Sequence, residues 1–284
     1  MNEKKPSVFK DKLTLVIGGT GKTGRRVAAR LTANGAPVRT GSRSADPAFD
    51  WDKPETWCGA LDGVHAVYVT YYPDLLVPEA AGRIGAFAKL AVARGARRLV
   101  LLSGRGEDGA VLCENALKAS GADWIVLRAS WFMQNFSESF LLEPLLAGEV
   151  ALPVGAVGEP FIHADDIADM AVEAFGDDRH IGQTYELTGP ALLTFGQAIG
   201  EISAALGRDI AYRQITPAQF NSDLAAAGLP DSDQALFMEL FTEVLDGRNA
   251  YITDDIARVL GRPPRAFANY VRETLATDVW RTVP

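Results

Sequence analysis

The chain has 284 residues, of which 48% are hydrophobic and 23% charged, a balance typical of a globular protein rather than a disordered one. Its formal net charge of −8 leaves no basic excess to neutralise a phosphate backbone, so we expect no nucleic-acid partner. The longest apolar runs have the length of a strand and are too short to span a bilayer, so we expect no membrane association.

The few thiols and imidazoles give no sign of a metal centre. Cys58 and Cys113 have no Cys or His neighbour at metal-ligand spacing, and two isolated thiols fit a reducing compartment. His65 and His180 stand apart from any ligand cluster, so we expect no bound metal. Residues 1–12 carry four lysines and no apolar stretch behind them, which argues against a secretory signal and favours a cytoplasmic protein.

Strand-length apolar runs alternate with helical patterns through the first half of the chain. Strands separated by helices of this length require parallel crossovers, which predicts an α/β fold with a doubly wound parallel sheet of the Rossmann type. The predicted strands cover residues 13–17, 37–41, 65–70, 97–102 and 124–128, and the predicted helices cover 23–34, 75–94 and 110–120.

The regular alternation ends near residue 130. We expect a dinucleotide-binding Rossmann domain over residues 1–150 and a smaller, mostly helical substrate lobe over 151–284, with residues of about 160–188 returning to the sheet. Helical patterns occupy residues 131–146, 165–175, 195–206, 217–227, 231–245 and 254–260, and strand-like pieces occupy 161–162, 184–187 and 210–213.

A glycine-rich turn links the first predicted strand to the first predicted helix. Gly18, Gly21 and Gly24 satisfy G-x-x-G-x-x-G, and Gly19, Gly21 and Gly24 satisfy G-x-G-x-x-G. Such glycines permit a tight turn, close approach of a pyrophosphate and close packing of helix on strand, and the helix N-terminus attracts phosphate. A P-loop would need its first glycine at Val16, inside the strand, so the turn predicts dinucleotide binding and not triphosphate binding.

The end of the second predicted strand bears on the choice of dinucleotide. A site for NAD places a carboxylate about 20 residues after the glycine turn, where this chain has Ser42, Arg43 and Ser44. Arg43 can form a bidentate pair with a 2′-phosphate, and either serine can donate to it. We therefore predict NADP as the cofactor, with NAD as the alternative because Asp46 lies close by.

Several further segments resemble a known family. Together with the glycine turn, the segments 101–103, 127–136, 161–168, 185–190 and 261–264 resemble the NmrA-like branch of atypical short-chain dehydrogenase/reductase (SDR) proteins, over roughly residues 13–270. Residues 49–51 and 131–136 resemble most the festuclavine/agroclavine-dehydrogenase-like subgroup. The branch includes NAD(P)H-dependent reductases of quinones, triarylmethane dyes and iminium-type alkaloids, and also redox-sensing regulators that bind the dinucleotide without turning it over.

The resemblance implies a set of cofactor contacts. The pyrophosphate would be held by Gly18, Thr20, Gly21, Lys22, Thr23 and Gly24 in the turn. The adenosine phosphate would meet Ser42 and Arg43, and the adenine would meet Asp50 and Trp51. The nicotinamide ribose would meet Thr70, Tyr71 and Tyr72, and the nicotinamide would meet Ser103, Ser130, Trp131 and Phe132.

The Tyr-x-x-x-Lys pair of typical SDR enzymes has no counterpart in this chain. The corresponding place reads Val-Leu-Cys-Glu-Asn over 111–115, with Lys118 a turn later. The remaining candidates for a proton donor are Tyr72, Ser103 and Glu114. Tyr72 could instead line the site, Glu114 could pair on its helix, and Ser103 could bond only to backbone.

Together these features predict an NAD(P)H-dependent reductase that acts by direct hydride transfer on a bulky, electrophilic small molecule such as a quinone, an iminium or a polycyclic aromatic compound. Such substrates need little acid catalysis, because positioning supplies most of the advantage. Aromatic residues at Trp131, Phe136, Phe140, Phe237 and Phe241 would suit a planar substrate. The alternative is a non-catalytic NADP-binding regulator, and we expect a monomer or homodimer in either case.

Overall fold

The computed structural model describes residues 12–281, so nearly all of the lysine-rich N-terminal segment lies outside the described residues. The chain divides into two compact units. Of the described residues, the first comprises 12–129, 164–186 and 258–261, and the second comprises 130–163, 187–257 and 262–281. The chain therefore leaves the first unit after Ala129 and returns to it at Ala164. The division of cofactor and substrate binding between the parts stays a prediction.

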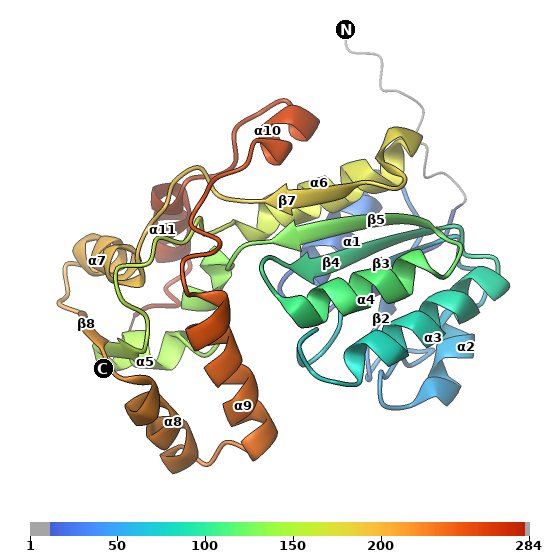
Figure 1. The fold of residues 1–284 in the computed structure, drawn as a ribbon. Helices are drawn as coiled ribbons and strands as arrows, with labels where there is room; N and C mark the ends of the chain where they lie inside the picture. The colour runs from blue at the N-terminus through green and yellow to red at the C-terminus, as the bar shows by residue number, and fades with distance from the viewer. Residues whose placement is uncertain (1–11, 282–284) are drawn as a thin grey trace, which may run out of the picture. The chain divides into compact units, whose positions relative to one another are not determined.

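The first unit is built on a parallel sheet with a Rossmann-like order, as predicted (Figure 1). Its order is β2-β1-β3-β4-β5-β7, so the chain reverses direction across the sheet between β1 and β3. Ligands bind at such a switch point, beyond the carboxyl ends of the strands. The strands are β1 (Thr14–Ile17), β2 (Val38–Gly41), β3 (Ala66–Val69), β4 (Arg98–Gly104), β5 (Asp123–Ala129) and β7 (Thr184–Leu187).

Helices cover both faces of this sheet because its strands are apolar on both sides. Figure 1 shows α3 and α4 on one face and α1 and α6 on the other. Two arginines of α1 pair with two aspartates of α6, Arg30 Nε lying 2.5 Å from Asp169 Oδ1. The bounds are α1 (Gly24–Ala33), η1 (Pro54–Thr56), α2 (Trp57–Ala60), α3 (Ala80–Ala93), α4 (Asp108–Lys118), α6 (Ala164–Gly176), η3 (Asp178–His180) and α10 (Asp255–Leu260).

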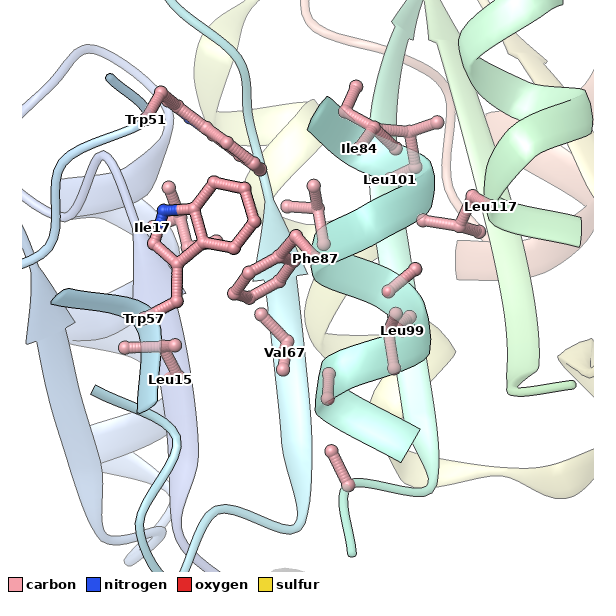
Figure 2. Close-up of a cluster of buried hydrophobic side chains, with 14 of the residues drawn as sticks. Leu15, Ile17, Trp51, Trp57, Val67, Ile84, Phe87, Leu99, Leu101 and Leu117 are labelled. Atoms are coloured by element: carbon pink, nitrogen blue, oxygen red, sulfur yellow. The ribbon is translucent and has the colours of Figure 1, made fainter. Parts of the chain in front are cut away.

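An aromatic cluster fills the core between the sheet and α2 and α3 (Figure 2). Phe49, Trp51, Trp57 and Phe87 meet mostly edge to face, with ring centres 5.0 to 6.5 Å apart. Both indoles satisfy their N–H groups, since Trp51 Nε1 donates to the carbonyl of Thr70 at 3.0 Å and Trp57 Nε1 to that of Asp50 at 2.8 Å. The first bond fixes the loop after β2 against the end of β3, and the second fixes α2 to the same loop.

The second unit has a separate core and is mostly helical. A two-stranded parallel sheet of β6 (Glu149–Leu152) and β8 (Ala211–Gln214) packs with helices around buried aromatic side chains. Phe136, Phe161, Phe195 and Phe267 form its centre, with neighbouring ring centres 5.1 to 6.0 Å apart. The helices are η2 (Met133–Phe136), α5 (Leu142–Ala147), α7 (Phe195–Leu206), α8 (Pro217–Ala226), α9 (Asp231–Glu239), η4 (Leu240–Val244) and α11 (Phe267–Leu275).

Three sequence predictions of secondary structure were wrong in detail. The helix expected over 131–146 is two short pieces, because the backbone of Phe132 bridges to Ile162 before η2 begins. The helix expected over 231–245 changes to a π-helix at Leu240, and the helix expected from residue 75 begins only at Ala80, two residues after Pro78. Helix α11 was not predicted, although Pro263 and Pro264 mark the loop before it.

No helix among residues 12–281 is long and apolar enough to span a membrane. The same residues contain no group of three or more His, Cys, Asp or Glu side chains arranged to hold a metal ion.

Candidate dinucleotide-binding site

The glycine turn lies at the carboxyl end of β1, beside the switch point of the sheet. Gly18 has a left-handed φ of 66°, and its N–H donates to the carbonyl of Gly41 on β2 at 2.9 Å. Gly21 N–H then donates to the carbonyl of Gly18 at 2.8 Å, which closes a tight turn before α1 begins at Gly24. Thr20 and Gly21 are exposed, so the outer side of the turn faces solvent.

The glycines of the turn are required by close backbone approaches. A Cβ on Gly24 would lie 2.1 Å from the carbonyl oxygen of Gly18, and one on Gly18 would lie 2.6 Å from Thr70 Oγ1. A Cβ on Gly21 meets only the Gly18 oxygen, at 3.2 Å. The turn is thus closed on its inner side and open where a pyrophosphate would lie, which is the fit that a dinucleotide requires.

The start of α1 adds donors and positive potential to this open side. The amides of Arg25 and Arg26 donate to the carbonyls of Gly21 and Thr23 at 3.1 Å, and the helix carries no acidic residue in its first turn to offset the positive potential of its N-terminus. Thr23 is buried at the N-cap position without a side-chain capping bond. Lys22 is half-buried, and its carbonyl accepts from Arg26 Nη1 at 2.7 Å. The predicted residues from Gly18 to Gly24 therefore lie together at the N-terminus of α1, the kind of position where phosphate groups bind in other proteins.

The loop after β2 presents its cationic side chain to solvent. Ser42 Oγ and Ser44 Oγ lie 3.4 Å apart, and the carbonyl of Ser42 accepts from the amides of Ala45 and Phe49 at 3.2 and 2.9 Å. Arg43 is exposed. A folded loop with an exposed guanidinium and two hydroxyl groups matches the chemistry of a phosphate, and within residues 12–281 Arg43 forms no ion pair with a carboxylate.

Four further predicted residues lie near the end of β3. Thr70 Oγ1 donates to the carbonyl of Ile17 at 3.0 Å, which ties β3 to the glycine turn. Trp51 is 7% exposed and belongs to the aromatic core, and Asp50 is half-buried beside it. The ring of Tyr71 packs on Trp51 at 4.9 Å, its hydroxyl accepts from Arg83 Nη1 at 3.2 Å, and burial raises the pKa of Tyr71.

Tyr72 differs from these neighbours because it is 73% exposed. The guanidinium carbon of Arg43 lies 6.0 Å from the centre of its ring, at the outer limit of a cation–π contact. Tyr72 and Arg43 therefore lie close together at the same edge of the sheet, with both functional groups accessible from solvent.

Ser103 and Glu114, by contrast, form a buried cluster. The register of β4 and β5 places Ser103 beside Arg128 on one face, and α4 places Glu114 over both. Ser103 Oγ donates to Glu114 Oε1 at 2.8 Å, and Arg128 holds the carboxylate with Nε at 2.7 Å and Nη2 at 2.8 Å. Lys118 Nζ adds a contact at 3.4 Å. We call these four residues the Glu114 cluster.

This arrangement determines the protonation state of Glu114. Burial of the carboxyl group raises its pKa, but the hydrogen bonds from Arg128 and Ser103 outweigh burial, so the pKa of Glu114 lies below its ordinary value. The carboxylate is therefore ionised near neutral pH and has no proton to give. Because Ser103 donates its hydroxyl proton to that carboxylate, Tyr72 is the one accessible proton donor among the three candidates.

Two charged residues that sequence reasoning did not single out extend the Glu114 cluster. Arg105 is 3% exposed and its Nε lies 3.3 Å from Glu186 Oε2, while Arg128 Nη1 lies 3.7 Å from Glu186 Oε1. A signal was present in the sequence, since Arg128 ends an otherwise apolar strand and a charge in that setting requires a partner. The sequence could not show that the partners come from α4 and β7.

The last three predicted cofactor contacts belong to the second unit. Ser130 N–H donates to the carbonyl of Leu187 at 3.0 Å, and Trp131 N–H donates to the buried carboxylate of Glu159 at 3.1 Å. Phe132 is half-buried. The ring of Trp131 is also half-buried and packs on Phe241 with centres 4.9 Å apart. Trp131 is therefore held in place by both its backbone N–H and its indole ring.

Comparison with known proteins places the chain in a family, although no family model matches it. The protein YesF of Bacillus subtilis, an uncharacterised oxidoreductase, is 33% identical over 288 residues, covering 96% of this chain and 99% of YesF. The chain belongs to the NmrA-like family of atypical SDR proteins. Within this family, an NAD(P)H azoreductase of Xenophilus azovorans is 30% identical and a festuclavine synthase of Penicillium roqueforti is 29% identical, over 92% and 89% of this chain and 97% and 95% of those proteins.

Solved structures agree with the fold. The NADPH complex of the quinone oxidoreductase QOR2 from Escherichia coli aligns with a TM-score of 0.74 at 20% identity, covering 93% of this chain and all of that one. Citrobacter triphenylmethane reductase aligns at 0.73 and 17% identity, covering 93% and 99%. The transcriptional regulator NmrA aligns at 0.71 and 16% identity, covering 95% and 97%. The family fold thus carries both reductases and a regulator.

Proposed function

We propose that the protein is an NADPH-dependent reductase of a bulky, electrophilic aromatic or quinone-like small molecule. The observation that carries the proposal is the turn from Gly18 to Gly24, closed on its inner side by backbone contacts and open to solvent beside the start of α1. Two proteins of the same fold have been solved with NADP(H) bound, in agreement with the predicted cofactor. When bound, a reduced nicotinamide dinucleotide supplies a hydride.

Each part of the site then has a defined task. The amides of the turn bind the pyrophosphate, and Arg43 with Ser42 binds the adenosine 2′-phosphate that distinguishes NADP from NAD. Thr70 holds the turn against β3. Tyr72, exposed at the same edge, is the residue that can donate a proton to a reduced substrate. The Glu114 cluster fixes β4, α4 and β5 relative to one another and takes no part in proton transfer.

The proposed substrate class rests on the relatives and on exposed aromatic surface in the second unit. Relatives and fold neighbours are named for azo compounds, quinones and triphenylmethane dyes, all of them aromatic or conjugated acceptors. In this chain Trp131, Phe140 and Phe237 are half-buried around the buried ring of Phe241, with neighbouring centres 4.9 to 6.4 Å apart. Half-exposed rings of this kind can stack on a planar substrate.

Steady-state oxidation of NADPH in the presence of acceptors tests the proposal. The panel should contain a quinone, an azo dye, a triarylmethane dye and an iminium compound, each assayed with NADPH and with NADH. We expect turnover with at least one conjugated acceptor, and faster turnover with NADPH than with NADH. Tight binding of NADPH without reduction of any acceptor would contradict the enzymatic proposal.

That contrary result would favour the second candidate, an NADP-binding regulator. Two observations support it. The regulator NmrA shares the fold, and two of the three predicted proton donors, Ser103 and Glu114, are hydrogen-bonded within the Glu114 cluster. Under this alternative, the oxidised and reduced cofactors would bind with different affinities and neither would be consumed. Competition binding of NADP and NADPH, measured beside the turnover assay, separates the two candidates.

A further inference from the structure

A small apolar cavity lies within the second unit, beside helices α7 and α11. Its volume is about 150 Å³, and its walls include Met133, Phe161, Leu193 and Phe267. An apolar cavity of about this size accommodates a single benzene-sized group. The side chain of Glu201, from the middle of α7, is the one acidic group in its lining.

Glu201 is unusual among the half-buried carboxylates of the chain because nothing pairs with it. Within residues 12–281 its carboxylate has no hydrogen bond and no ion pair. Burial alone raises the pKa of Glu201. Glu114, by comparison, accepts from four donor atoms of Ser103, Arg128 and Lys118. A partly desolvated carboxylate without a partner is costly, and a cationic ligand would remove that cost.

A second, more open hollow adjoins the first and shares Glu201 and Ala268 with it. Its volume is about 440 Å³, and its lining includes Val271, Arg272 and Leu275 of α11. Arg272 is the charged group that faces Glu201 across this hollow, but its Nη2 donates to Asn269 Oδ1 at 2.9 Å. Glu201 therefore lies where the open hollow and the apolar cavity adjoin.

We propose that this cavity binds a small apolar amine, with the protonated nitrogen on the carboxylate of Glu201 and the hydrocarbon or aryl group against the wall that includes Met133, Phe161, Leu193 and Phe267. The carboxylate supplies charge complementarity and a hydrogen-bond acceptor. Aromatic rings in the wall attract both an apolar group and the cation attached to it. The site is built from residues of the second unit alone, so it does not depend on the dinucleotide proposal.

Binding of phenethylamine to the full-length protein tests this site, with phenethyl alcohol as a neutral probe of the same shape. Calorimetry or ligand-detected NMR should show saturable binding of the amine and at least about tenfold weaker binding of the alcohol, as expected for loss of a charge-assisted hydrogen bond. Glu201→Gln should weaken binding of the amine to the level of the alcohol and leave NADPH affinity unchanged. Glu239→Gln, at an exposed position of α9, is the matched control and should change neither.

Ala268→Leu provides a variant that keeps the carboxylate. Ala268 is exposed on α11 and borders both hollows, so a larger side chain there should block entry and reduce amine binding at least about tenfold. Equal binding of amine and alcohol by the wild-type protein would overturn the proposal. So would full amine binding by Glu201→Gln, or no amine binding at all. Because NADPH affinity is measured in the same samples, none of these results could be confused with failure of the dinucleotide site.

Discussion

Two regions at the same edge of the first unit's sheet satisfy their polar groups in opposite ways. The glycine turn presents backbone groups to solvent and has no side chain between them and a ligand. In the Glu114 cluster, at the same edge, the charged side chains pair with one another. Ser103 and Glu114 are 3% and 0% exposed. The turn can receive an anion without losing a contact, whereas the cluster would have to break a bidentate pair to act on a ligand.

The difference separates what nucleotide binding requires from what acid catalysis requires. Binding of a dinucleotide needs only backbone geometry and a helix terminus, and both are present. Acid catalysis needs a poised side chain, and the buried carboxylate on α4 has a lowered pKa and full hydrogen bonding instead. The account therefore predicts that changes in the turn and in the loop after β2 control NADPH binding, while changes in the cluster control stability.

Gly24→Ala should have the largest effect on NADPH binding. Its Cβ would lie 2.1 Å from the carbonyl oxygen of Gly18, so the turn must move and its amides lose their alignment. We expect NADPH binding to fall below detection in a fluorescence titration. Gly82→Ala is the control, since this glycine is exposed on α3 with open space around it, and it should bind NADPH normally while stabilising the helix by roughly 0.5–1 kcal/mol. Normal NADPH binding by Gly24→Ala would contradict the assignment.

Arg43→Ala should weaken NADPH binding by about 10- to 100-fold, as expected for loss of a charged hydrogen bond worth about 1.5–3 kcal/mol. NADH lacks the 2′-phosphate, so its affinity should change less than about twofold. Arg94→Ala, which removes an exposed arginine at the end of α3, is the control and should affect neither nucleotide. Equal losses for NADPH and NADH would remove Arg43 from the phosphate site.

Glu114→Ala should have the smallest effect on NADPH, within about threefold, and the largest on stability. It leaves Arg128 and Ser103 without their acceptor and should lower the free energy of unfolding by about 3 kcal/mol. Chemical denaturation measures the stability, and titration of the folded variant measures the affinity. A large loss of NADPH affinity in a variant of unchanged stability would show that the cluster belongs to the binding site.

The pH dependence of stability sharpens the same contrast. A carboxyl group whose pKa is lowered by folding stabilises the protein fully above its unfolded pKa of 4.5, and this contribution is lost as the pH falls through the folded value. The wild-type protein should therefore lose stability below about pH 4.5 more steeply than Glu114→Gln, whose side chain does not titrate. Denaturation midpoints measured from about pH 6 down to about pH 3 test this, and parallel curves would contradict it.

Much of the fold was predictable because it follows from local patterns. Continuous apolar strands, a glycine turn and helices of crossover length required a doubly wound sheet, and the sheet is present. The segment after residue 130 was harder, because the bridge between Phe132 and Ile162 joins residues 30 apart and overrides a helical pattern. Helix α11 was missed for a similar reason, since its apolar face is explained only by its partner α7.

The same distinction between local pattern and tertiary contact applies to the candidate site. The turn could be located because its glycine spacing, visible in the sequence, follows from close backbone contacts within the turn itself. The sequence could not tell that Trp51 turns into the aromatic core, or that Glu114 pairs with Arg128, because residue type alone does not reveal which face a side chain takes. Roles proposed for individual cofactor contacts stay predictions until a nucleotide is bound.

Titration of the wild-type protein with NADPH, NADH and no acceptor present tests the central claim most directly. Isothermal calorimetry should show one saturable site per chain for NADPH, with weaker binding of NADH, and both signals should vanish in Gly24→Ala. Absence of binding for both nucleotides by folded wild-type protein would contradict the account, because the open turn would then be only a connection between strand and helix.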